Sequence, residues 1–258
     1  MKIGIVIPLK SKAASKKWDT TCDSLEDTVR SIDNQTSNQF EAVIVGHDCP
    51  EFFLKNKHKV FFHTLETPPP DKNASEFTQD DYTLDKNKKI VRGMQLLKKK
   101  DITYWYTLDA DDLLDRNFIE KISNMDCKSG CILDGGYIIY KKYKLVVPHD
   151  NLSLVCGSTS ILSNKLFRIP DNLDYESMKK VPWCRYPHMD MDKYFEIELN
   201  KPYLHISDRF IGYVLGHGDN CSDGYRSNYY YRIKSFLKPF LIGRRLSKNI
   251  REKYSLME

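Results

Sequence analysis

The sequence of 258 residues is 41% hydrophobic and 12% aromatic, which is enough to bury the core of one large domain, or of a domain with a small appendage. It contains no apolar run of about 18 residues, and the apolar start at residues 1–10 is interrupted by Pro8 and lacks a small-residue cleavage site. Neither a spanning helix nor a signal peptide is therefore expected. The seven cysteines are scattered singly and leave at least one unpaired, which favours the reducing cytoplasm as the location.

The net charge of +5 is concentrated at the C-terminal end. Residues 227–258 hold eight bases and two acids, a net charge of +6, and the rest of the chain is close to neutral. Aromatic and aliphatic residues alternate with these bases, as in segments that rest on an anionic membrane surface, here the inner face. The solvated face of one or two C-terminal helices packed on the body is an equally good interpretation. Nucleic acid is not an expected partner, because the remaining chain has no second basic stripe and no reader motif.

The first half alternates between buried-strand and helix patterns. Apolar runs predict strands at residues 2–8, 40–48 and 59–65, and an amphipathic stretch predicts a helix at 23–34 that Asp23 or Ser24 would cap. The prolines at 68–70 and the polar residues up to 81 predict a long loop. This half therefore resembles βαβ units, with acidic residues at the carboxyl ends of strands, where ligands bind in open α/β sheets.

The second half begins with a helix predicted at residues 86–100 and a strand at 104–108. A short helix is expected at 117–124, two strands within 131–147, and a mixed region from residue 156 onward. No internal repeat or low-complexity linker separates these elements. The body is therefore expected to be one α/β domain.

Residues 104–115, YWYTLDADDLLD, place Asp109, Asp111 and Asp112 directly after an apolar strand. Like charges this close repel one another and lose solvation, so a positively charged partner is indicated. An EF-hand loop starting at Asp109 fails, because Leu113 and Leu114 stand where an oxygen ligand and a glycine are required.

Two further interpretations of the acidic motif are weaker than a metal site. A Walker B aspartate would require a glycine-rich phosphate loop, which the sequence lacks. A helix cap explains one carboxylate but not three. The remaining interpretation is a divalent cation held by these carboxylates against a nucleotide diphosphate.

At this point the sequence resembles the GT-A glycosyltransferases, close to family 2, over about residues 1–220. The resemblance rests on five stretches in a fixed order: IVIPLK with Pro8, VIVGHD ending at Asp48, DKNKKIVRGM with Lys86 and Lys89, Asp109-Ala110-Asp111, and VLGHGDN with His217. It implies a Rossmann-like, mixed and mainly parallel sheet flanked by helices. The implied domain spans residues 1–226, with a nucleotide-sugar half at about 1–112 and an acceptor-side half at 113–226, followed by a helical basic extension at 227–258.

The resemblance also implies a donor site. Asp48 stands where relatives hydrogen-bond the nucleobase, typically uracil, and Asp109 stands where the ribose or a metal-bound water is contacted. The implied nucleotide-binding positions are Pro8, Asp48, Lys86, Lys89, Asp109 and Ala110. The two lysines depart from the arginine or asparagine pattern of many relatives, so a solvated helix face remains open for them.

For the metal, the resemblance implies Asp111 as a ligand of Mn²⁺ or Mg²⁺. His217, in a glycine-flanked turn, matches the position of a further ligand or a diphosphate contact, and imidazole suits Mn²⁺. A structural role for this histidine is the alternative.

Relatives place a catalytic base at the start of a helix well after the acidic motif. The sequence offers His188, Asp190 and Asp192 there, and Asp190 is favoured. The usual Glu-Asp pair is absent, because Met189 precedes Asp190. Either aspartate could instead cap the helix.

The expected function is metal-dependent transfer of a sugar from a nucleotide-diphosphate donor, such as a UDP-sugar, to a saccharide or lipid-linked acceptor, as in polysaccharide biosynthesis. A single displacement with inversion is favoured, and retention stays open. A sugar-nucleotide nucleotidyltransferase is an alternative, although IVIPLKSKAAS lacks the glycine-rich signature. A non-catalytic carbohydrate- or membrane-binding module is another, and it would bind saccharide without metal.

Overall fold

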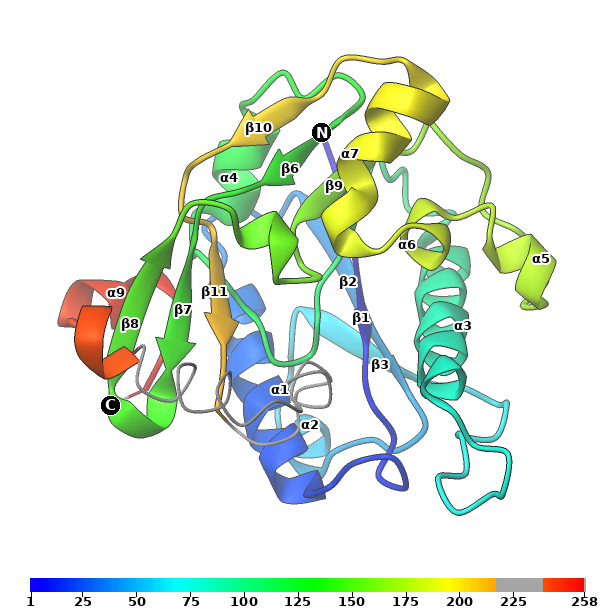
Figure 1. Ribbon diagram of the computed structural model, residues 1–258, viewed down its shortest axis with the longest axis horizontal. Helices are drawn as coiled ribbons and strands as arrows, with labels where there is room; N and C mark the ends of the chain where they lie inside the picture. The colour runs from blue at the N-terminus through cyan, green and yellow to red at the C-terminus, as the bar shows by residue number, and fades with distance from the viewer. Residues whose placement is uncertain (217–238, 258) are drawn as a thin grey trace.

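A seven-stranded sheet forms the centre of the molecule in the computed structural model, which describes residues 1–216 and 239–257 (Figure 1). The strand order is β10-β6-β9-β4-β1-β2-β3. The strands are β1 (Ile3–Pro8), β2 (Phe40–Gly46), β3 (Val60–Thr64), β4 (Tyr104–Thr107), β6 (Gly130–Leu133), β9 (Ser160–Ser163) and β10 (Leu204–Ile206). Only β9 runs antiparallel to its neighbours, β4 and β6. The predicted fold class, a mixed and mainly parallel sheet flanked by helices, is confirmed.

Two long helices cover opposite faces of this sheet, α1 (Trp18–Asp33) and α3 (Gln79–Leu97) (Figure 1). Strand β1 is buried at every residue, and its side chains alternate between the two faces. Ile5 packs in the cluster that contains Val29 of α1, whereas Val6 packs in the cluster that contains Met94 of α3. Helix α3 approaches β1 closely at Gly93, where an added Cβ would lie 2.3 Å from a Val6 methyl group.

A second sheet of five strands lies beside the first, in the order β12-β8-β7-β11-β5. Its strands are β5 (Leu113–Leu114), β7 (Gly136–Tyr140), β8 (Leu145–His149), β11 (Ile211–Val214) and β12 (Arg244–Arg245). The last helix, α9 (Lys248–Lys253), leads to Tyr254, which is fully buried and donates hydrogen bonds to the carbonyl groups of Arg209 and Ile211. The described end of the chain is therefore packed on the body. The expected boundary at residue 226 lies outside the described residues and stays a prediction.

The described residues also include several short helices: α2 (Glu51–Lys55), α4 (Phe118–Ser123), α5 (Tyr175–Met178), α6 (Pro182–Arg185), α7 (Met191–Lys193) and a π-helical turn, η4 (Tyr194–Leu199). Phe195, at the start of this turn, packs with Ile132 of β6 and Leu162 of β9 and so covers that end of the large sheet. No helix within residues 1–216 or 239–257 is long and apolar enough to cross a membrane.

Both long helices begin earlier than the sequence pattern predicts. Helix α1 begins at Trp18, so neither Asp23 nor Ser24 caps it; Trp18 packs against the core about two turns before Leu25. Helix α3 begins at Gln79 instead of residue 86, because Thr78 and Asp81 form a capping box in which the Thr78 N–H donates to the Asp81 carboxylate (2.7 Å). The predicted loop therefore ends at Thr78. Residues 131–147 contribute to three strands instead of two, and these belong to different sheets.

Candidate functional site

The strand order of the large sheet reverses at β1. The chain runs from β1 to β2 and β3 on one side and then returns to place β4 on the other side of β1. The carboxyl ends of β1 and β4 therefore lie at the point where the strand order reverses, which is where open α/β sheets bind ligands. Pro8 ends β1, Asp109 follows β4 by two residues, and Asp48 follows β2 by two residues. The predicted donor-site residues thus share one edge of the sheet.

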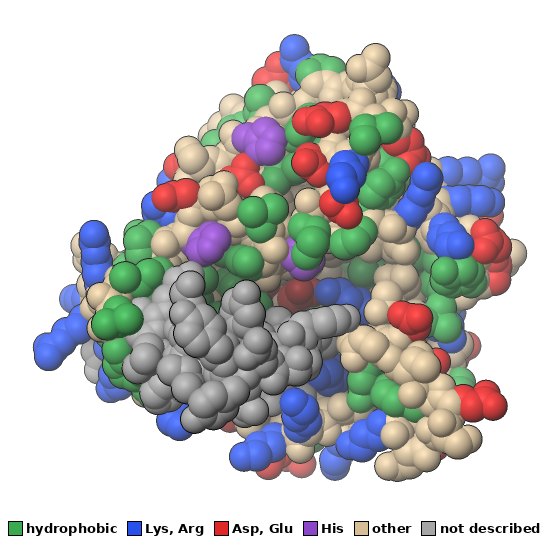
Figure 2. Space-filling model, in the orientation of Figure 1, with side chains coloured by type: hydrophobic (Ala, Val, Ile, Leu, Met, Phe, Trp, Pro, Cys, Tyr) green, Lys and Arg blue, Asp and Glu red, His purple; other side chains and the backbone are tan. Residues whose placement is uncertain are grey.

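Asp109 is held from several sides. The Lys86 ammonium of α3 donates to Oδ1 of Asp109 (2.6 Å), and the backbone N–H of Asp109 donates to the Ser158 hydroxyl (2.9 Å). A Cβ added at Gly157 would lie 2.6 Å from Oδ2. The neighbouring Ala110 is tied to α1, because the Thr28 hydroxyl donates to its carbonyl group (3.1 Å). Figure 2 shows one face of the molecule. Near its middle the surface is hollowed, and acidic, basic and histidine side chains gather there.

Asp112 points into the protein interior and stabilises the turn that carries Asp109 and Asp111. Its side chain is buried and accepts hydrogen bonds from the Ser158 hydroxyl (2.6 Å) and the Cys156 thiol (3.2 Å). Burial, followed by the charges of Asp111 and Asp109, raises the pKa of Asp112 well above its ordinary value. Ser158 therefore connects the buried Asp112 to the backbone of Asp109, which fixes the turn that carries Asp111.

The turn carries Asp111, the predicted metal ligand, two residues after Asp109. Within residues 1–216 and 239–257, no three His, Cys, Asp or Glu side chains lie close enough together to hold a metal by themselves. Mg²⁺ sites that work on phosphates need only one or two carboxylates, because phosphate oxygens and water complete the shell. The oxygen donors present fit such an ion. The other predicted ligand, His217, lies outside the described residues.

Asp48 connects the end of β2 to the loop after β1. Its Oδ2 accepts the backbone N–H of Lys12 (2.8 Å), and its side chain is only partly buried. An acceptor oxygen is therefore fixed at the sheet edge that also carries Pro8.

A buried charge network that sequence reasoning missed lies under this edge. His47 Nε2 and the Lys89 ammonium contact the two oxygens of Asp85, at 2.8 and 2.5 Å. The Lys89 side chain is 1% exposed, so it is not on a solvated helix face, and burial lowers its pKa although Asp85 opposes this shift. Lys89 thus supports the end of β2 from inside, through Asp85 and His47. The four-residue spacing of Asp85 and Lys89 was the available sequence signal.

Of the three candidate bases, His188 has a pKa that is lowered by its surroundings. Burial lowers the pKa of His188, while the charge of Asp109 raises it and that of Lys86 lowers it. Its Nε2 is buried and has no hydrogen-bond partner among the described residues. Asp190 instead pairs with Lys193 (2.7 Å), and Asp192 accepts the backbone N–H of Lys193 (2.8 Å). The preference for Asp190 is not tested by these contacts, and all three residues stay candidates.

No protein-family model and no curated protein matches the sequence. Among solved structures, the chain is similar to Staphylococcus aureus TarS 1–349, at 12% identity and a TM-score of 0.44, over 83% of this chain and 60% of that one. For TarS 1–349 in complex with UDP, the identity is 13% and the TM-score 0.47, over 84% of this chain and 61% of that one. For S. aureus TarS, the identity is 13% and the TM-score 0.43, over 93% of this chain and 40% of that one. The chain thus spans less than two thirds of each of these chains, and a similarity of this degree identifies no function.

Proposed function

We propose that the protein is a glycosyltransferase that moves a sugar from a nucleotide-diphosphate donor, with a UDP-sugar favoured, to a saccharide or lipid-linked acceptor. The observation that carries the proposal is the contact between Lys86 and Asp109 at the carboxyl end of β4, where the strand order reverses. A diphosphate requires positive charge and a ribose requires hydrogen-bond acceptors. Lys86 and Asp109 supply both at one point.

The donor would lie along the sheet edge from β2 to β4. A uracil ring has an N–H that needs an acceptor, and Asp48 offers one at the end of β2. Asp109 would accept a ribose hydroxyl, while Lys86 contacts a phosphate oxygen as a compact, mobile cation. The distribution of these groups agrees with the order of base, ribose and diphosphate in a nucleotide.

Asp111 would hold Mn²⁺ or Mg²⁺ at the diphosphate. When bound, such an ion supplies Lewis-acid stabilisation of the charge that develops on the leaving phosphate. The Lys86 ammonium adds a second, protein-borne positive charge at the same place. Asp112 and Ser158 keep this turn in position.

On the acceptor side, a base must take the proton of the attacking hydroxyl while the bond from the sugar carbon to the phosphate oxygen breaks. His188 is favoured because its Nε2 is buried and has no hydrogen-bond partner among the described residues. Its lowered pKa leaves the imidazole neutral near pH 7, the form that accepts a proton. Asp190 and Asp192 are the alternatives, and a single displacement with inversion is the proposed course.

Calorimetric titration with UDP, GDP and dTDP, with and without Mn²⁺, tests the donor site. We expect Mn²⁺-dependent binding of one nucleotide, and a loss of affinity of at least about tenfold in Asp111→Ala, because charge-assisted contacts are typically worth about 1.5–3 kcal/mol. Asp171→Ala is the matched control, since Asp171 is 74% exposed and pairs only loosely with Lys98 (3.4 Å). Absence of binding in both conditions would contradict the proposal.

Turnover separates the alternative functions. A glycosyltransferase releases the nucleoside diphosphate from a nucleotide-sugar, whereas a nucleotidyltransferase releases pyrophosphate from a nucleoside triphosphate and a sugar phosphate. A binding module releases neither and retains saccharide when the metal is chelated. Measuring both products with the same protein therefore distinguishes the three functions.

A further inference from the structure

Three consecutive large apolar side chains are exposed near the start of the described range 239–257. Residues 239–242 are helical, and Phe240, Leu241 and Ile242 are 51%, 78% and 55% exposed. The N–H of Gly243 donates to the carbonyl group of Pro239 (2.9 Å) and closes this turn. Single exposed apolar residues are common on soluble proteins, but a contiguous group of them marks a contact surface. We refer to residues 239–242 as the apolar turn.

The apolar turn is held by contacts with β8 and with the connection between β7 and β8. Strand β12, which follows it, pairs with β8, and the Leu246 N–H donates to the carbonyl group of Lys144 (2.8 Å). The Phe240 ring packs on Tyr143, with 4.9 Å between the ring centroids. The turn is therefore attached to the connection between β7 and β8 at several points.

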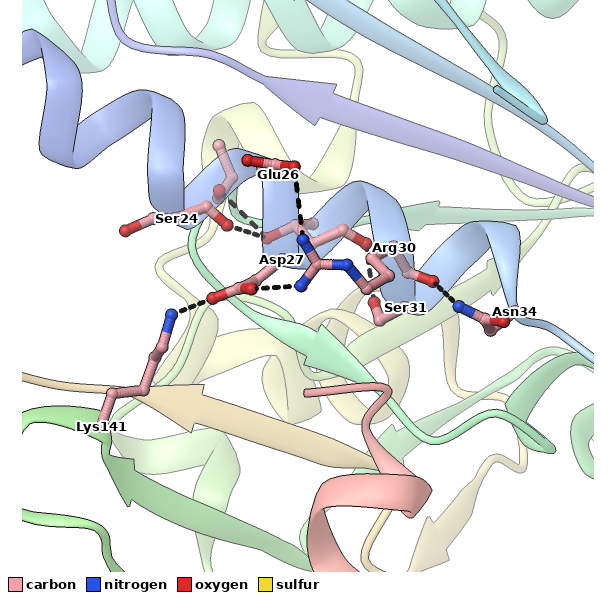
Figure 3. Close-up of polar contacts among 9 residues, drawn as sticks. Ser24, Glu26, Asp27, Arg30, Ser31, Asn34 and Lys141 are labelled. Carbon is pink, nitrogen blue, oxygen red and sulfur yellow. Dashed lines mark hydrogen bonds and ion pairs between the residues drawn. The ribbon is translucent and has the colours of Figure 1, made fainter. Parts of the chain in front are cut away.

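That connection is in turn anchored to α1. Lys141 forms an ion pair with Asp27, which is 8% exposed and also accepts from Arg30 (2.7 Å), as Figure 3 shows. Side chains of α1 thus hold the first residue of the connection, while Tyr143, two residues later, carries Phe240. The exposed side chains of the apolar turn are consequently held in place by contacts that extend to α1.

Basic side chains accompany the apolar turn. Lys142, Lys144, Arg244 and Arg245 are exposed, and none forms an ion pair with another residue of the described ranges. They are brought together by the pairing of β12 with β8, and neither residues 141–149 nor residues 239–251 contain an acid. Apolar and basic side chains lie together at the left edge of the face in Figure 2, where Figure 1 places β8 and the C-terminal segment. The surface therefore complements a negatively charged one.

We propose that the apolar turn and these four bases dock the protein on the surface of an anionic lipid bilayer. An apolar group alone or a basic cluster alone binds membranes weakly, whereas the two together give stable interfacial attachment. Leu241 and Ile242 would enter the boundary between headgroups and acyl chains, and the bases would contact lipid phosphates. The proposal does not depend on the nucleotide-sugar chemistry, because it uses none of the residues assigned to the donor site.

Cosedimentation of the full chain with vesicles tests the docking. We expect binding to vesicles made of equal parts phosphatidylcholine and phosphatidylglycerol at low salt, weaker binding at high salt, and little binding to pure phosphatidylcholine. Each base near an anionic surface contributes about a fivefold change in partitioning, so Arg244→Gln with Arg245→Gln should lower it by at least about tenfold. Leu241→Ser with Ile242→Ser should lower partitioning by at least roughly tenfold through the loss of apolar burial.

Leu54→Ser with Ile197→Ser is the matched control, because these residues are 75% and 77% exposed but lie on α2 and η4. It should bind vesicles as the wild type does, and circular dichroism should show that every variant is folded. Failure of the wild type to bind anionic vesicles at low salt would overturn the proposal, as would equal binding by the Leu241/Ile242 variant. A lipid-free dimer that this variant dissociates, detected by sedimentation velocity, would assign the surface to self-association instead.

Discussion

Lys86 on α3 and Asp109 after β4 form an ion pair with 2.6 Å between Nζ and Oδ1. The two side chains are 45% and 28% exposed, so water screens the pair. Exposed ion pairs contribute about 0–1 kcal/mol to folding. Stability therefore does not account for a cation and an anion facing one another at the carboxyl end of β4. In the proposed donor site, a nucleotide-sugar would contact both groups.

Replacing Lys86 by methionine tests this role. Lys86→Met should lower the affinity for the nucleoside diphosphate by about tenfold, because a charge-assisted hydrogen bond is lost, while the free energy of unfolding changes by less than about 1 kcal/mol. Lys98→Met is the control: Lys98 follows the same helix, is 49% exposed and also pairs with an aspartate. Calorimetry on both variants measures the nucleotide affinity, and urea unfolding measures the free energy of unfolding. Equal effects of the two substitutions on binding would contradict a specific role for Lys86.

Gly157 limits the orientation of Asp109. In Gly157→Ala, the new Cβ would lie 2.6 Å from Oδ2 of Asp109, and the carboxylate, being the end of a side chain, can turn away. We expect a loss of nucleotide affinity of roughly tenfold, with a destabilisation of no more than about 1 kcal/mol. In a double-mutant cycle, Gly157→Ala should add little to Asp109→Ala, because both act on the same carboxylate. Full additivity in calorimetry would show that Gly157 acts elsewhere.

The first four strands of the large sheet follow closely from the sequence. Apolar runs buried on both faces are the signature of central parallel strands, and the carboxyl ends of such strands share one edge. The placement of Asp48 and Asp109 at the same edge of the sheet was therefore predictable from two segments read independently. The start of α3 was also recoverable, because Thr78 and Asp81 have the spacing of a capping box.

The second sheet could not be predicted in the same way. Its strands pair across long separations, as when β11 pairs with β7 and β5, and a periodic pattern states that a strand exists without naming its partner. The same limit applies to the site. The contact of Lys86 with Asp109 and the burial of the His188 ring both depend on how separate segments pack.

The lowered pKa of His188 predicts how stability depends on pH. Because burial lowers the folded-state pKa below the ordinary value of 6.5, the unfolded chain binds this proton more readily than the folded one. Stability is then lost as pH falls below 6.5, until the folded-state pKa is passed. In His188→Asn, the urea midpoint should decline less than in the wild type between about pH 7.5 and 5.5. Subtracting the two pH profiles of the urea midpoint cancels the contribution of the other histidines. Parallel profiles would mean that His188 is solvated in the native state.

Tyr254 tests whether the end of the chain is part of the folded body. Its hydroxyl donates to the carbonyl groups of Arg209 (2.8 Å) and Ile211 (3.2 Å), and its ring is buried beside β11. Tyr254→Phe keeps the ring but leaves these acceptors without their donor, so urea unfolding should show a loss of about 1–2 kcal/mol. Tyr175→Phe, at a residue that is 59% exposed, should change stability by less than about 0.5 kcal/mol. If both variants unfold as the wild type does, the C-terminal segment separates from the body before the body unfolds; a loss confined to Tyr254→Phe means that the two unfold together.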